Sequence, residues 1–143
     1  MVNLGGSGMS APMIGHKYPA KRYSLNRANL VAYANASGDQ NPIHQNEDFA
    51  KSVGLPNVIA HGMYTMGLAA TYVGEIVGDS GRIREISAKF VKPVVVPSGV
   101  DVELEISAAV TSVLDSVVSI EITVMCEGVK VLAGAKASFA VEN

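Results

Sequence analysis

The sequence predicts a single α+β domain in which an antiparallel sheet wraps around one long helix. The length of 143 residues fits one domain better than two. Apolar residues follow helical spacing in the first half of the chain and alternate with polar residues in the second half. Residues 62–77, between the two halves, are apolar nearly all round. We therefore expect this helix to be buried against the apolar face of the sheet.

Two shorter helices are expected in the first half. After an extended segment at residues 21–25, residues 26–36 carry apolar side chains at helical spacing, and Gly38 can end this helix in the left-handed conformation. The other short helix spans residues 47–53, with Asn46 as its N-cap.

Four strands with one polar and one apolar face are expected in the second half. They span residues 82–91, 100–107, 119–124 and 129–141. The last two should pair across Glu127 and Gly128, which are typical hairpin-turn residues. The apolar face of these strands needs a helix to cover it, and residues 62–77 are the candidate.

Composition and charge narrow the function class. The net charge is −2 with scattered basic residues, so no nucleic-acid partner is expected. No stretch reaches the roughly 18 to 20 apolar residues of a membrane span, so no membrane partner is expected either. Cys126 is the only cysteine, which excludes an internal disulfide and favours a cytoplasmic protein. The apolar content of 48% against 17% charged residues favours a surface covered by a second subunit.

The first eight residues, MVNLGGSG, are typical of a flexible leader or an expression remnant, with Met9 as the natural start. They lack the basic-then-apolar pattern of a secretory signal. We therefore place residues 1–9 outside the domain and residues 10–143 within it.

Two titratable groups, Asp39 and His44, stand five residues apart. Asn41 and Pro42 between them have strong turn chemistry, so one interpretation is a polar connection between two helices. Spacing alone favours this interpretation. The functional one needs both side chains on one side of a rigid turn, where a carboxylate and a neutral imidazole could orient and deprotonate one water.

His61 and Gly62 mark the start of the long helix. We interpret His61 as a flanking residue satisfied by hydrogen bonds, in preference to a proton-transfer group. Gly62 leaves its backbone N–H open to a ligand, and the helix N-terminus adds partial positive charge there. A developing oxyanion would be stabilised at such a place.

Other chemistries have weaker signals. Asp39, His44 and His61 would together make a three-ligand metal site, but neither His–His nor His–Cys pairs occur at short metal-binding spacings, so no metal is expected. Cys126 lies in an expected strand, where a small buried hydrophobe is the preferred interpretation. Nucleophilic catalysis is therefore disfavoured.

A longer pattern contains these residues. The stretch Tyr33–Met63 closely resembles the signature of the MaoC-like dehydratases, the (R)-specific enoyl-CoA hydratase family. The shared motifs fall on Tyr33-Ala34, Ser37–Asp39, Asn41–His44 and Ile59–Met63. The chain looks most like short single-domain members, such as the β subunit of the mycobacterial (3R)-hydroxyacyl-ACP dehydratase. This resemblance favours the functional interpretation of Asp39 and His44.

The resemblance implies a hot-dog fold, assembled as a homodimer or heterodimer. It implies that Asp39 and His44 are a catalytic dyad, which holds the water that adds to a trans-2-enoyl thioester to give a (3R)-hydroxyacyl thioester. It assigns Gly62 to binding of the thioester carbonyl, with Asn41 and His61 in the same substrate-binding region. No metal and no bound cofactor are implied, because an acyl-CoA or acyl-ACP substrate itself carries CoA or phosphopantetheine.

Two alternatives stay open. A hot-dog acyl-thioesterase would share the fold, although it would lack the D-x-N-P-x-H arrangement. The chain could instead be a subunit of a heterodimeric acyl-ACP dehydratase. Intact Asp39 and His44 would then make it the catalytic member of the pair.

Overall fold

The computed structural model describes residues 11–141. The leader expected at residues 1–9 lies outside the described residues. In chain order the elements are β1 (Lys17–Leu25), α1 (Arg27–Ser37), the 3-10 turn η1 (Pro42–His44), α2 (Glu47–Ser52), α3 (Gly62–Val77), the 3-10 turn η2 (Ser80–Arg82), β2 (Ile83–Phe90), β3 (Val102–Leu114), β4 (Val117–Cys126), β5 (Val129–Lys130) and β6 (Leu132–Ala140). None of the helices in this part of the chain is long and apolar enough to cross a membrane.

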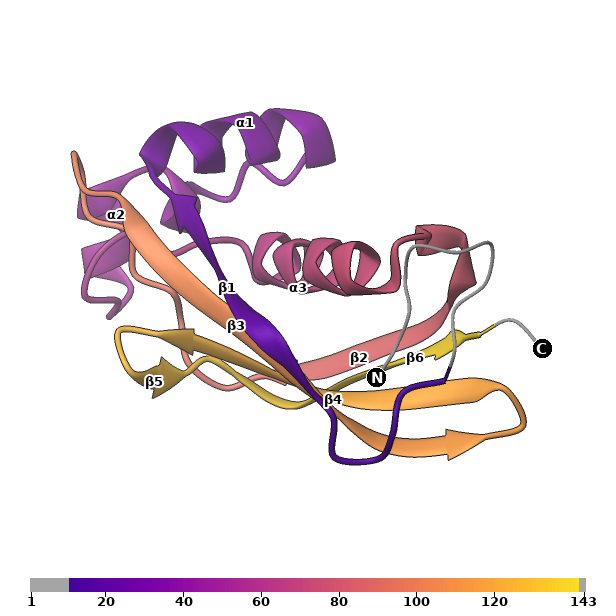
Figure 1. The fold of residues 1–143 in the computed structure, drawn as a ribbon. Coiled ribbons are helices and arrows are strands. Elements are labelled where there is room, and N and C mark those ends of the chain that lie inside the picture. The colour runs from indigo at the N-terminus through magenta and orange to yellow at the C-terminus, as the bar shows by residue number, and fades with distance from the viewer. Residues whose placement is uncertain (1–10, 142–143) are drawn as a thin grey trace.

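One antiparallel sheet contains the six strands of the described chain. Its order is β1-β3-β4-β6-β2, with β5 paired to β4 beside this path. The sheet curves around α3, and α1 and α2 gather near the end where α3 begins (Figure 1). Strands β3 and β4 bury alternate residues, as a half-buried sheet requires. The predicted α+β architecture, a sheet wrapped around one helix, is confirmed.

The predicted helices are confirmed to within one residue at each end. Helix α3 has the predicted bounds. Gly38 ends α1 in the left-handed conformation with a φ of 82°, as its missing side chain allows. Asn46 caps α2, because its side-chain oxygen accepts a hydrogen bond of 2.9 Å from the N–H of Phe49.

The strand prediction is incomplete in three places. The extended segment at residues 21–25 is the second half of β1, which pairs with β3. Strands β3 and β4 meet in a tight hairpin at Asp115 and Ser116, whose φ values are 51° and 62°. The turn between β4 and β5 lies at Glu127-Gly128, as predicted. The strand expected at residues 129–141 is divided into β5 and β6. With β1 added, the sheet therefore has six strands rather than four.

The prediction that α3 is buried holds for only one stripe of the helix in the described chain. Its buried residues are Thr65, Ala69, Tyr72, Val73 and Val77. The opposite stripe is exposed and consists of Met63, Gly67, Thr71 and Glu75. A helix that lies on one sheet buries only the stripe that faces its neighbours. The other stripe stays exposed, although Lys21 and Tyr23 of β1 contact Glu75 there.

The segment before α3 is held by an extended pairing with residues that follow β2. The N–H of Ala60 donates to the carbonyl of Val94 at 2.9 Å, and the N–H of Val96 donates to the carbonyl of Val58 at 2.8 Å. Arg27 at the start of α1 donates to the carbonyl of Val96 at 2.6 Å. These bonds fix the path of the chain into the N-terminus of α3, where the candidate site lies.

Candidate active site

Asp39 stands in the tight turn after α1. The N–H of Asn41 donates to Asp39 Oδ1 at 3.1 Å, and the N–H of Ile43 donates to Asn41 Oδ1 at 3.1 Å. Such side-chain bonds to the backbone two residues on close an Asx turn. The turn fixes one carboxylate oxygen of Asp39, and the other, Oδ2, lies on the side of His44. Asn41 thus braces the turn and caps η1.

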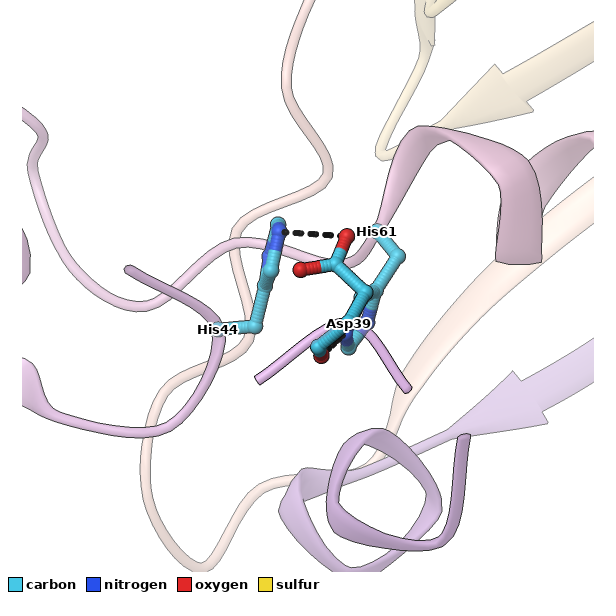
Figure 2. Close-up of side chains that lie close together, drawn as sticks. All are labelled: Asp39, His44 and His61. Atoms are coloured by element: carbon cyan, nitrogen blue, oxygen red, sulfur yellow. Dashed lines mark hydrogen bonds and ion pairs between the residues drawn. The ribbon is translucent and has the colours of Figure 1, made fainter. Parts of the chain in front are cut away.

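His44 is almost fully buried, with 7% of its surface exposed. Its Nδ1 lies 2.7 Å from the backbone carbonyl of Ile59. A carbonyl only accepts, so Nδ1 carries the proton, and Nε2 of the neutral ring keeps its lone pair. His44 Nε2 lies 4.0 Å from Asp39 Oδ2, and Figure 2 shows the two side chains facing each other. That separation is too long for a direct hydrogen bond.

His61 lies beside this pair, immediately before α3. Its ring is 2% exposed, and its Nε2 is 3.1 Å from the backbone carbonyl of Asp39. The ring stacks on His44, with centroids 3.8 Å apart and planes 23° apart. Its Nδ1 is buried and has no hydrogen-bond partner among the described residues. Burial lowers the pKa of His61 below its ordinary value, which favours the neutral ring.

A cavity of about 340 Å³ opens beside His44 and the start of α3. Most of its lining is apolar, which suits a ligand with a hydrocarbon part. The residues that line it are His44, Ile59, Ala60, Gly62, Thr65, Phe90, Val91, Lys92, Pro93, Val94, Val131 and Leu132. Asp39, Asn41 and His61 are not among them, although Asn41 and His61 were expected in the substrate-binding region and Asp39 in the catalytic dyad.

Two groups that line the cavity have unused hydrogen-bonding capacity. The N–H of Gly62 opens α3 and has no partner in the described chain, because the first N–H groups of a helix have no intrahelical acceptor. Thr65 is 4% exposed, and within residues 11–141 its hydroxyl makes no hydrogen bond. Sequence reasoning missed Thr65. Its only signal is a hydroxyl among the apolar residues of a buried helix.

Asp39, His44 and His61 also form the one group of metal-ligand side chains found in the described residues. One donor atom from each lies within 4.8 Å of the others. One further atom of each residue already has a protein partner: Asp39 Oδ1, His44 Nδ1 and His61 Nε2. The donor set is one that catalytic zinc uses, and the buried Nδ1 of His61 has no hydrogen-bond partner in the described chain. The expectation of no metal stays a prediction.

Known proteins match most of the chain. The family described as MaoC like domain matches residues 10–127. The 3-hydroxyacyl-thioester dehydratase X of Mycobacterium tuberculosis is 39% identical over 80 residues, which is 56% of this chain and 28% of that protein. The 3-hydroxybutyryl-CoA dehydratase of Methylorubrum extorquens is 32% identical over 84 residues, which is 58% of this chain and 54% of that protein.

A solved structure described as a MaoC-like dehydratase has the same fold. The TM-score is 0.90 at 32% identity, over 92% of this chain and 41% of that one. This likeness confirms the expected hot-dog arrangement. The chain spans only part of the length of each of these three proteins.

Proposed function

This chain belongs to the MaoC-like domain family, and on that basis we propose that it adds water reversibly to trans-2-enoyl thioesters, giving (3R)-hydroxyacyl thioesters. One observation carries the proposal. Asp39 Oδ2 and His44 Nε2 face each other at 4.0 Å, and His44 lines the cavity at the start of α3. The two curated relatives support it, since both are named as dehydratases of acyl thioesters.

The arrangement of the two groups suits activation of one water. A water that donates to the carboxylate of Asp39 and to the lone pair of His44 Nε2 can bridge a 4.0 Å gap. As its oxygen attacks C3 of the enoyl group, the pair takes up one of its protons. The pair then supplies a proton to C2, so the hydration is balanced without any other reactant.

The N-terminus of α3 suits the thioester carbonyl. Negative charge develops on that oxygen as water adds, and the free N–H of Gly62 together with the helix dipole would stabilise it. The hydroxyl of Thr65 lines the same cavity one helical turn further on. We assign it as a second donor toward the substrate, since it has no partner in the described chain.

The proposed substrate is an acyl-CoA or an acyl-ACP of fatty-acid metabolism. The carrier is part of the substrate, so the proposed reaction needs no resident cofactor. A second hot-dog subunit, identical or not, is proposed to cover part of the exposed apolar surface. Phe90 and Val91 at the edge strand β2 support this, being 54% and 46% exposed. The cytoplasmic location stays a prediction.

The test is to incubate the protein with crotonyl-CoA, and separately with a crotonyl acyl carrier protein. If the protein hydrates enoyl thioesters, we expect loss of the enoyl absorbance and formation of a (3R)-hydroxybutyryl product. Release of free thiol without hydration would instead identify a thioesterase. A folded protein that hydrates neither substrate, alone or with a co-purified partner, would contradict the proposal.

A further inference from the structure

We propose that His61 is a positioning residue, which anchors the backbone of Asp39 and supports the ring of His44 without touching the substrate. The reaction that it serves rests on the proposed function. The arrangement itself rests on the contacts of His61, which hold whatever reaction the site performs.

The first contact fixes the position of Asp39. The other hydrogen bonds of this residue are local: its Oδ1 accepts from Asn41 N–H, and its own N–H donates to Ser37 Oγ at 3.1 Å. Its side chain is 52% exposed, so packing does little to hold it. The bond from His61 Nε2–H to the Asp39 carbonyl, 22 residues along the chain, is the long-range hydrogen bond that ties this turn to α3.

The second contact fixes the ring plane of His44. One face of this ring lies on His61 at 3.8 Å. Behind His61 lies the ring of Tyr33, with centroids 4.7 Å apart, and Tyr33 in turn stacks on Tyr64 at 5.1 Å. Four rings from α1, η1 and α3 thus support one another. Together with the bond from His44 Nδ1 to the Ile59 carbonyl, they direct His44 Nε2 toward Asp39.

The hydrogen bond and the burial of His61 favour a neutral ring that does not transfer protons. A donor at Nε2 leaves the neutral ring with a lone pair at Nδ1, which is buried without a partner. A proton there would place a charge in a dry site, stacked on another imidazole. Burial accordingly lowers the pKa of His61.

Three variants at position 61 separate positioning from catalysis. The amide nitrogen of glutamine lies near the place of histidine Nε2, whereas that of asparagine lies near the place of Nδ1. His61→Gln should therefore keep the bond to the Asp39 carbonyl, and His61→Asn and His61→Leu should lose it. Misplacement of a catalytic group by about 1 Å costs about 100-fold. We expect kcat to fall about 100-fold in the asparagine and leucine variants, with KM little changed, and less than about 10-fold in the glutamine variant.

His16→Gln is the matched control, because His16 is exposed and remote from the site. Tyr33→Leu removes only the supporting ring and replaces His61→Asn if that variant does not fold. We expect about a 10-fold lower kcat for Tyr33→Leu, in keeping with a smaller displacement of His44. Equal loss of activity in His61→Gln and His61→Asn, with both folded, would overturn the proposal.

Nitrogen-15 NMR of the three histidine rings tests the arrangement independently of activity. The His16→Gln and His44→Gln variants assign the signals. We expect His61 to be neutral and protonated at Nε2 at pH 7, and to take up a second proton at a lower pH than an ordinary histidine, because burial lowers its pKa. A His61 that is protonated at Nδ1, or charged at neutral pH, would overturn the proposal. An inactive wild type that shows the expected tautomer would contradict the proposed reaction and still support the positioning of Asp39 and His44 by His61.

Discussion

Replacement of Gly62 by alanine tests whether the start of α3 binds the thioester carbonyl. A Cβ at this position would lie 3.2 Å from two carbon atoms of the Phe90 ring and 3.3 Å from a third. These contacts are tighter than ordinary packing by a few tenths of an ångström, and Phe90 is 54% exposed, so its ring can shift. Alanine also has a higher helix propensity than glycine, by up to about 1 kcal/mol. We therefore expect the free energy of unfolding to stay within about 1 kcal/mol of wild type.

Activity should respond much more strongly than stability. The new methyl group would lie beside the free N–H in the cavity, and the shifted Phe90 ring would narrow the same cavity. Loss of one oxyanion-hole donor costs about 10²- to 10³-fold in kcat. We expect a fall of about 100-fold in kcat with crotonyl-CoA. Gly74→Ala is the control, since it lies on the same helix and its added Cβ would meet its nearest neighbour at 3.7 Å.

Two measurements decide the outcome for Gly62→Ala. Urea denaturation gives the free energy of unfolding, and the rate of enoyl absorbance loss gives kcat and KM. Wild-type kcat in a folded Gly62→Ala protein would refute the assignment of the carbonyl site. Equal loss of activity in Gly74→Ala would show that the effect is general to the helix.

Three further variants or conditions test the contacts of Thr65, Arg27 and His61. Thr65→Val should lower kcat/KM about 10-fold. It should leave the free energy of unfolding unchanged or higher, because the lost hydroxyl has no partner in the described chain. Thr65→Ser should recover activity, and full activity of Thr65→Val would contradict the role of Thr65 as a donor to the substrate. Arg27→Ala should lower the free energy of unfolding by about 1.5–3 kcal/mol, because Arg27 donates hydrogen bonds to the Val96 carbonyl at 2.6 Å and to Asn57 Oδ1 at 2.9 Å. A loss under about 0.5 kcal/mol in urea denaturation would contradict this. Because burial lowers the pKa of His61, the unfolded chain binds more protons than the folded chain below about pH 6.5. Stability should therefore fall as the pH drops through that range, and an unchanged slope in His61→Gln would contradict this cause.

The parts of the fold that sequence predicts are those with local chemical signals. Helix α3 begins and ends where expected, because Gly62 opens a largely apolar segment and Gly78 ends it with a φ of 84°. The hairpin at Asp115 and Ser116 carries no such signal. Both residues adopt positive φ without being glycine, and the alternation of β3 is broken by a bulge just before them, between Val110 and Ser112.

The candidate site likewise contains residues that local sequence motifs reveal and residues that only the folded structure reveals. Asp39 and His44 are found by motif, because a short turn determines their separation. The bond between His61 and the Asp39 carbonyl spans 22 residues, so its existence depends on how α1 packs beside α3. Sequence analysis does not identify Thr65, because a threonine in an apolar helix is ordinarily interpreted as a core residue. Its importance comes from a cavity between α3 and β2, which no local pattern encodes.

The central claim is that Asp39 and His44 act together on one water. A double-mutant comparison of Asp39→Asn, His44→Gln and the combined variant tests it most directly, with kcat measured on crotonyl-CoA and folding checked by urea denaturation. Residues that act as a unit show strongly non-additive losses. We predict that each single variant loses nearly all activity, and that the combined variant is no slower than the slower single one. Near-wild-type hydration by either single variant, or losses that multiply in the combined variant, would contradict the account.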